Sequence, residues 1–266
     1  LGAAIGGPLA LAAVLALPAT WHLRGSAPPD PIQFRHTIIG LSNPDISISP
    51  DGRTLAFVAK PDTVGTSTLW VRGTGEVTSP RLAGTDNASQ PFWSPDNQSI
   101  AFVVGDKLKK IDVAGGVSGA VKELTDAPGF SGGAWSPAGG GTIVFGTPKG
   151  LSRVSAQGGP AQTITELGQG ETGHLWPGFL PDGTHFLYLA WSAEAANRAV
   201  YVGALDSKDR TKLMSEESNA EYAAPGYVLF RRKAVLFAQP FNASSLAFTG
   251  DPVQLAAKVG GQPFEF

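Results

Sequence analysis

Ser49-Pro50-Asp51-Gly52 decides the fold of this chain, because the stretch returns at a regular interval. Three further copies are clear and a fifth is degenerate: Ser94-Pro95-Asp96-Asn97, Ser136-Pro137-Ala138-Gly139, Leu180-Pro181-Asp182-Gly183 and Ala224-Pro225-Gly226. Successive prolines are 45, 42, 44 and 44 residues apart. A fixed period of this length indicates a repeat protein in which each repeat is one small structural unit.

The repeated stretch has the composition of a tight turn. Proline presets φ for the second turn position, Asp can bond its own backbone, and Gly or Asn takes the corner with positive φ. Ala138 shows that the third copy dispenses with the carboxylate. We therefore interpret the turn residues as structural and not as ligands: they are Pro50, Asp51, Gly52, Pro95, Asp96, Pro137, Pro181, Asp182 and Gly183.

Apolar residues alternate on both sides of each turn. After the prolines the pattern gives pairs such as Leu55/Phe57, Ile100/Phe102 and Ile143/Phe145, which would point to one face of a strand. A third and a fourth short run complete each unit. Four short strands per period predict an all-β protein, a β-propeller over residues 34–266. A helical solenoid is the structural alternative, but prolines and Gly pairs interrupt every window long enough for a helix.

Five units are visible in the sequence, and we expect an incomplete ring of six or more blades. Residues 34–41 could supply a strand that latches the last blade. An open ring would leave the edge of the fifth blade unpaired.

Several segments resemble a known family. They are Leu69-Trp70-Val71-Arg72, Leu82-Ala83-Gly84-Thr85-Asp86, Pro91-Phe92-Trp93-Ser94-Pro95-Asp96, Ile111-Asp112-Val113-Ala114-Gly115-Gly116, His174-Leu175-Trp176-Pro177 and Gly250-Asp251-Pro252-Val253. Together with the repeated turn, they are similar to TolB-like, WD-repeat-like bacterial propellers. The nearest subgroup is the extracytoplasmic propellers that follow a membrane span in bacterial eukaryotic-like serine/threonine protein kinases. The resemblance covers roughly residues 34–259 and implies a sensor domain.

The first residues predict a membrane anchor. Residues 1–21 carry no charge, and about 20 helical residues cross a bilayer core. The alternative is a signal peptide cleaved near Ala19. Residues 22–33 hold three prolines and read as a short tether. We expect a single pass through a bacterial inner membrane with the propeller in the periplasm.

Composition excludes several classes of site. A formal net charge of −2 gives no electrostatic footprint for nucleic acid. The chain has no cysteine, and its four histidines show no recognised ligand spacing. We expect no metal site and no cofactor. His174 is interpreted as a loop histidine packed against tryptophan, with a ligand role as the alternative.

Two short motifs match sequence patterns that occur in enzymes. Residues 129–133 match G-x-S-x-G around Ser131, but a nucleophile elbow needs a strand before it and a helix after it. Residues 168–173 match G-x-G-x-x-G, but prolines follow at once, so no phosphate-binding helix can begin there. Both are predicted to be loops between blades, and the segment is predicted to be non-catalytic.

Function should then lie on loops held by a rigid scaffold. The connections between blades share one face, where a protein or a small extracytoplasmic ligand would bind. The candidate residues there are Asp86, Asn87, Asp126, Glu171, His174, Glu216 and Glu217. The first hypothesis is a sensor domain of a receptor-like kinase. A free periplasmic TolB-like scaffold, or the gating propeller of a prolyl-oligopeptidase-like hydrolase, are the alternatives.

Overall fold

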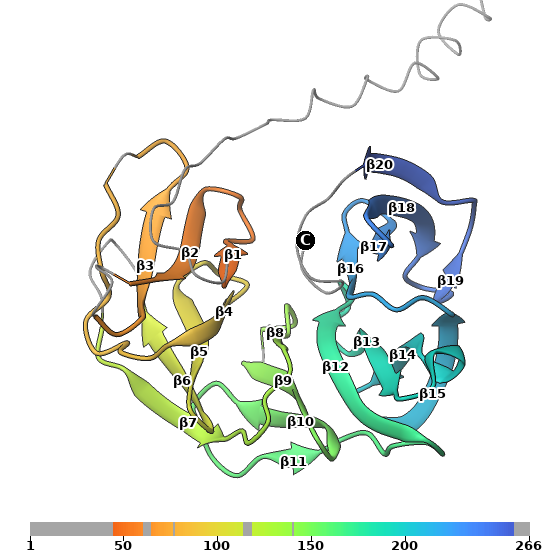
Figure 1. The fold of residues 1–266 in the computed structure, drawn as a ribbon, viewed down its shortest axis with the longest axis horizontal. Coiled ribbons are helices and arrows are strands. Elements are labelled where there is room, and N and C mark those ends of the chain that lie inside the picture. The colour runs from red at the N-terminus through yellow and green to blue at the C-terminus, as the bar shows by residue number, and fades with distance from the viewer. Residues whose placement is uncertain (1–44, 61–64, 77, 114–118, 140, 258–266) are drawn as a thin grey trace, which may run out of the picture. The chain divides into compact units, whose positions relative to one another are not determined.

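A computed structural model describes residues 45–257 except 61–64, 77, 114–118 and 140. Five antiparallel sheets follow one another along the chain and form the blades of a propeller (Figure 1). Blade 1 holds β1 (Ile46–Ile48), β2 (Thr54–Ala59) and β3 (Thr68–Gly73). Blade 2 holds β4 (Ser89–Trp93), β5 (Ser99–Val104), β6 (Lys107–Asp112) and β7 (Lys122–Asp126). Blade 3 holds β8 (Gly133–Trp135), β9 (Thr142–Thr147), β10 (Gly150–Ser155) and β11 (Gln162–Thr163).

The last two blades contain the longest strands, which have eight or nine residues. Blade 4 holds β12 (Glu171–Phe179), β13 (His185–Ser192), β14 (Ala199–Ala204) and β15 (Ser207–Met214), with one 3-10 turn, η2 (Ala195–Asn197). Blade 5 holds β16 (Ala220–Ala223), β17 (Tyr227–Arg232), β18 (Val235–Asn242), β19 (Ala247–Phe248) and β20 (Val253–Ala257). The predicted all-β propeller is confirmed, and the described residues form five of its blades.

Two blades differ from the predicted four strands. In blade 1 the fourth run is reduced to one bridge between Trp70 and Arg81, because Pro80 has no N–H to donate to a ladder. In blade 5 the eight-residue β18 is long enough to pair with both β19 and β20. The blades therefore contain between three and five strands.

The repeated turns join the first strand of a blade to the second. Their corner residues have positive φ: 71° at Gly52, 60° at Asn97, and 66° at both Gly139 and Gly183. Ser49 donates its hydroxyl to Asp51 at 2.6 Å, and Ser94 does the same to Asp96 at 2.5 Å. These side-chain bonds close each turn on itself.

The third turn lacks this carboxylate, and its serine is used differently. With Ala138 in place of the Asp, the Ser136 hydroxyl donates 2.8 Å across to the Gly183 carbonyl of the next turn. The serine hydroxyl of the third turn therefore donates its hydrogen bond to the neighbouring blade instead of to its own turn.

The core lies between the blades in separate apolar layers. Side chains alternate along each strand, so in β5 Ile100 and Phe102 pack on blade 1 while Ala101 and Val103 pack on blade 3. Burial of a side chain as large as Ile100 or Phe102 contributes about 1.5–3 kcal/mol. The same arrangement recurs between blades 3 and 4 and between blades 4 and 5.

The G-x-S-x-G segment is a packing feature of blade 3. A Cβ at Gly132 would lie 2.9 Å from the Trp176 Cα, and one at Gly133 would lie 2.8 Å from the Phe92 ring. The Ser131 carbonyl accepts the Trp176 N–H at 2.9 Å. Glycines are needed here because neighbouring blades approach closely, and strand β8 follows instead of a helix.

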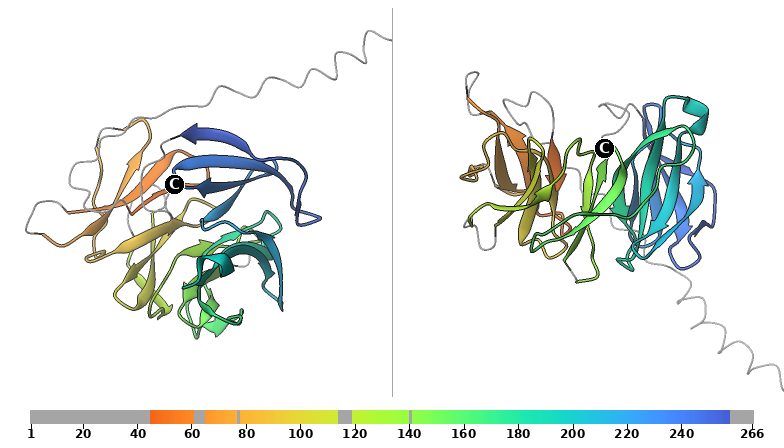
Figure 2. Two further views of the ribbon diagram at one scale, coloured as in Figure 1. Left: turned by 45° about the vertical axis from the view of Figure 1, so that its right-hand side comes forward. Right: turned by 90° about the horizontal axis from the view of Figure 1, so that it is seen from below.

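Strand connections leave the blades at two ends, which Figure 2 shows from the side. We call the end with the repeated turns the turn face, and the end with the connections between blades the loop face. The predicted span 1–21, the tether 22–33 and the latch strand 34–41 lie outside the described residues. Within the described part, no helix has the length and apolar character needed to cross a bilayer.

Candidate functional site

Glu171 and His174 meet in a polar cluster between blades 3 and 4. They lie on β12, the innermost strand of blade 4, where register shifts interrupt the pairing with β13. His174 Nε2 is 3.0 Å from Glu171 Oε2, and His174 Nδ1 is 2.7 Å from the Thr165 hydroxyl. Arg210, reaching over from β15, places Nη1 2.8 Å from Glu171.

The partners of His174 define its protonation. The Thr165 oxygen already accepts the Leu151 N–H at 2.8 Å, so its own proton is free to go to His174 Nδ1. The Nε2–H then donates to the Glu171 carboxylate, which makes the ring a neutral imidazole with both nitrogens used. Burial lowers the pKa of His174, although Glu171 acts in the opposite direction. The side chain is 0% exposed.

Glu171 stays ionised inside the cluster. Burial works to raise the pKa of its carboxyl group, but hydrogen bonds from Arg210, the Gly168 N–H and His174 outweigh burial and lower it. The Gly168 N–H donates at 2.5 Å. Glu171 therefore fixes the connection between blades 3 and 4 to its own strand.

Aromatic rings line the other side of the cluster. The His174 ring is 4.7 Å from Tyr188, and the Arg210 guanidinium lies 4.3 Å over the Tyr201 ring. The buried Tyr188 hydroxyl makes no hydrogen bond within the described residues. Burial, only partly offset by Arg210, raises the pKa of Tyr188 to about 12. The phenol therefore stays neutral.

This cluster holds a loop in place and presents no free imidazole lone pair to a substrate. Both imidazole nitrogens are engaged, and the ring is sealed from solvent. The Ser131 hydroxyl donates weakly, at 3.4 Å, to the backbone carbonyl of His174. It makes no hydrogen bond with the imidazole in the part of the chain that is described, so the arrangement is not that of a nucleophile and its base.

Two sequence predictions need correction here. Glu171 and His174 were expected on a loop, but both lie on β12, which begins at Glu171. His174 was expected to pack against tryptophan, but its ring contact is with Tyr188. The bulges in β12 explain the difference, because they allow a Gly-rich segment to remain in a strand.

The other predicted residues do not join this cluster. Asn87 adopts φ 61° in the connection before β4. The four remaining carboxylates each form an ion pair within their own region of the chain: Asp86 with Arg81 at 2.7 Å, Asp126 with Lys107 at 2.5 Å, Glu217 with Arg198 at 2.5 Å, and Glu216 with Arg232 at 2.6 Å. The loop face thus carries fixed pairs of opposite charge.

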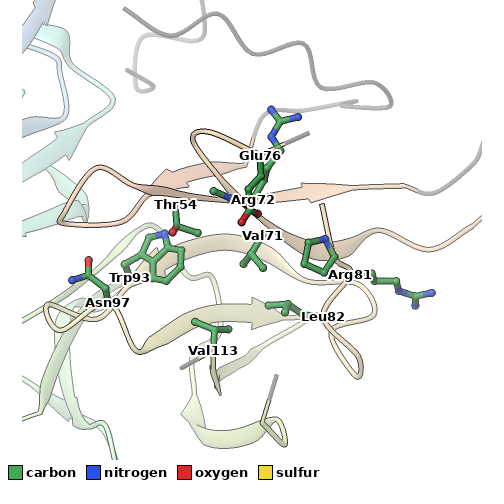
Figure 3. A pocket seen from close by; sticks show the side chains of 11 residues that line it. Thr54, Val71, Arg72, Glu76, Arg81, Leu82, Trp93, Asn97 and Val113 are labelled. Carbon is green, nitrogen blue, oxygen red and sulfur yellow. Dashed lines mark hydrogen bonds between the residues drawn. The ribbon is translucent and has the colours of Figure 1, made fainter. Parts of the chain in front are cut away.

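A cavity at the turn face was not foreseen. It has a volume of about 260 Å³ and lies between blades 1 and 2, where Val71, Leu82, Trp93 and Val113 surround it (Figure 3). Asn97 stands at one end of it. A similar groove of about 440 Å³ lies between blades 2 and 3.

Sequence reasoning also missed Arg210 and Thr165. Arg210 is 39 residues from Glu171 and gives no local signal. Thr165 has a recognisable counterpart, because the Thr85 hydroxyl accepts the Leu69 N–H at 3.0 Å in blade 1. The threonines in the connections after blades 1 and 3 were the signal available.

Comparison with known proteins supports the fold. No protein-family model matches the chain, and no curated protein matches it. TolB from Acinetobacter baumannii is similar in structure at 15% identity and a TM-score of 0.58, covering 74% of this chain and 51% of TolB. A putative TolB from Agrobacterium tumefaciens is 20% identical with a TM-score of 0.54, covering 71% of this chain and 72% of the other.

A protease propeller is comparably similar. The β-propeller domain of the Trilobed protease from Pyrococcus furiosus is 15% identical with a TM-score of 0.52, covering 81% of this chain and 84% of that domain. This chain spans about half the length of the Acinetobacter TolB. These likenesses show a TolB-like β-propeller fold.

Proposed function

We propose that this chain is a binding module that recognises an extracytoplasmic protein through its loop face. The observation that carries the proposal is the set of ion pairs there. Arg81–Asp86, Lys107–Asp126, Arg198–Glu217 and Arg232–Glu216 each hold a charged side chain in a fixed direction. Charges fixed in this way suit a complementary protein surface, where they govern specificity and the rate of association more than affinity.

The buried cluster supports the same proposal. Glu171 and Arg210 fasten the connection between blades 3 and 4 through Gly168. A loop that is already ordered loses less entropy on binding a partner. Function placed on loops that a rigid scaffold holds is the usual arrangement in such folds.

The resemblance to kinase-associated propellers extends the proposal to a receptor. In that scheme residues 1–21 cross the inner membrane and the propeller reports a periplasmic signal to a cytoplasmic kinase domain. Retention in the membrane pellet after alkaline extraction, lost on deletion of residues 1–21, is the expected result. Kinase motifs in the gene upstream of Leu1 are the second requirement, and their absence would leave a periplasmic TolB-like scaffold.

The second candidate is the gating propeller of a prolyl-oligopeptidase-like hydrolase. Its support is the likeness to the propeller of the Trilobed protease. It requires a hydrolase domain with a true G-x-S-x-G between a strand and a helix. Finding that domain downstream in the gene would favour this candidate over the receptor.

Photocrosslinking in living cells tests the interface. A photoreactive amino acid is placed at Asn87 or Ala196 at the loop-face end, and at Ser244 or Ser245 at the turn-face end as matched exposed controls outside the ion pairs. We expect a discrete protein adduct from the loop face that is lost when Arg81 and Arg198 are changed to Glu. Adducts of equal yield from both faces, or none from the loop face, would contradict the proposal.

A further inference from the structure

Among the first four repeat turns, neighbouring turns are bridged by a hydrogen bond in two cases and unbridged in one. Between turns 1 and 2, the Asp51 N–H donates to the Asn97 side-chain oxygen at 3.1 Å. Between turns 3 and 4, Ser136 donates to the Gly183 carbonyl at 2.8 Å. Among the described residues, no hydrogen bond joins turn 2 to turn 3. The corner of turn 3 is Gly139, which has no side chain to make the bridge that Asn97 makes.

The unbridged pair borders an open groove. Its volume is about 440 Å³, against about 260 Å³ for the bridged counterpart between blades 1 and 2. Pro95 and Pro137 form its rims, and Trp135, Lys110 and Gln157 also line it. A side chain at Gly139 would meet no atom within 4 Å of its Cβ. The groove is therefore open at the position where Asn97 closes its neighbour.

Two N–H donors in this groove are unused, although their counterparts are bonded. The Trp93 indole N–H donates to the Ser47 carbonyl at 3.1 Å, whereas that of Trp135 bonds nothing in the described part of the chain. The Asp51 N–H bonds Asn97, whereas the Asp96 N–H bonds none of the described residues. Asp96 is exposed and Trp135 is partly exposed, so both N–H groups are accessible to an acceptor of a ligand in the groove.

The charged side chains around the groove favour a ligand whose hydrogen-bond acceptor is uncharged. The Asp96 carboxylate accepts from Ser94 and from the Gln98 N–H, and Asp112 lies 3.3 Å from Lys110 Nζ. Of these charged groups, Asp96 and Lys110 line the groove. Because Asp112 offsets the charge of Lys110, the Asp96 carboxylate disfavours an anionic ligand. A carboxamide oxygen carries no charge, and it is the group that fills the equivalent place in the groove between blades 1 and 2.

We propose that this groove binds an extended peptide that presents an asparagine carboxamide. The carboxamide oxygen accepts a hydrogen bond from the Asp96 N–H, as the Asn97 side-chain oxygen accepts one from the Asp51 N–H. A backbone carbonyl of the peptide accepts a hydrogen bond from the Trp135 indole N–H. The Cβ of the peptide asparagine packs between Pro95 and Pro137. The site is on the turn face and does not depend on the interface proposed for the loop face.

Indole NMR of the 15N-labelled full chain in detergent micelles tests this site. The probes are the blocked tripeptides acetyl-Gly-Asn-Gly-amide, its Asp analogue and its Ala analogue. They are titrated to about 10 mM, which is high enough to detect a Kd of about 1 mM. The Trp135 signal is assigned from the loss of one peak in Trp135→Phe. We expect the Asn peptide to shift Trp135 and not Trp93, and the Asp and Ala peptides to bind at least about tenfold more weakly.

Gly139→Asn is the matched variant. Asn tolerates positive φ, as Asn97 shows at 60°, so the new side chain should bridge to turn 2 and fill the groove. Peptide affinity should fall at least about tenfold, while an unchanged Trp93 signal reports an intact fold. The proposal is overturned if the Asn peptide leaves Trp135 unmoved, if the Ala peptide shifts it equally, or if Gly139→Asn binds as well as the parent.

Discussion

Thr165→Val should weaken the propeller through the buried cluster between blades 3 and 4. Valine keeps the shape of threonine but removes the hydroxyl that accepts the Leu151 N–H at 2.8 Å and lies 2.7 Å from His174 Nδ1. One buried donor and one buried acceptor are then left without partners. Each such loss costs about 1–3 kcal/mol, so we expect the free energy of unfolding to fall by about 2–6 kcal/mol.

Urea denaturation measures this loss, with the midpoint and slope compared between variants. Thr163→Val is the matched control, because Thr163 is exposed on β11 and should change stability by less than about 0.5 kcal/mol. In a His174→Leu background the acceptor is already absent. The penalty for Thr165→Val should then shrink by about 1–3 kcal/mol.

The reasoning fails if Thr165→Val costs less than about 1 kcal/mol. It also fails if the penalty is the same with and without His174. Either result would mean that the two hydrogen bonds do not hold the connection between the blades.

Acidification should destabilise the propeller, because the folded state lowers the pKa of both His174 and Glu171 below their usual 6.5 and 4.5. The unfolded chain takes up protons first, so thermal stability should begin to fall below about pH 6.5, and His174→Gln should flatten the upper part of this decline. Gly146→Ala should lower the melting temperature sharply or prevent folding, since its Cβ would lie 2.6 Å from the His174 carbonyl oxygen. Gly183→Asn should lower the free energy of unfolding, because a Cβ there would lie 2.6 Å from the Ala138 backbone nitrogen in the preceding turn. Gly139→Asn has open space and should stay within about 0.5 kcal/mol of the parent.

The fold was predictable because the residue types of the repeated turn determine its backbone conformation. A proline followed two residues later by Gly or Asn demands a left-handed corner, and Gly52, Asn97 and Gly183 all have one. The features that were not predicted depend on contacts between residues that are far apart in the sequence. The weak fourth strand at Arg81 and the double pairing of β18 follow from chain geometry that no local pattern records.

The candidate site was predictable only in part, for a related reason. Glu171 and His174 are three residues apart and could be noticed together, but Arg210 reaches them across the full width of blade 4. Asp126 and Glu217 looked like free carboxylates in sequence. In the structure they are neutralised by Lys107 and Arg198, which lie 19 residues away in each case.

The corner of the repeated turn admits only two common residues, and they have opposite consequences for the surface. Asn97 spans the seam to the preceding blade, whereas Gly139 leaves its seam accessible. At Gly183 the seam is closed from the other side, because Ser136 donates to the glycine carbonyl. Because Asn and Gly both accept the left-handed conformation, one codon per repeat can close or open a crevice without disturbing the apolar layers beneath. A propeller of this kind could acquire or lose side pockets during evolution one blade at a time.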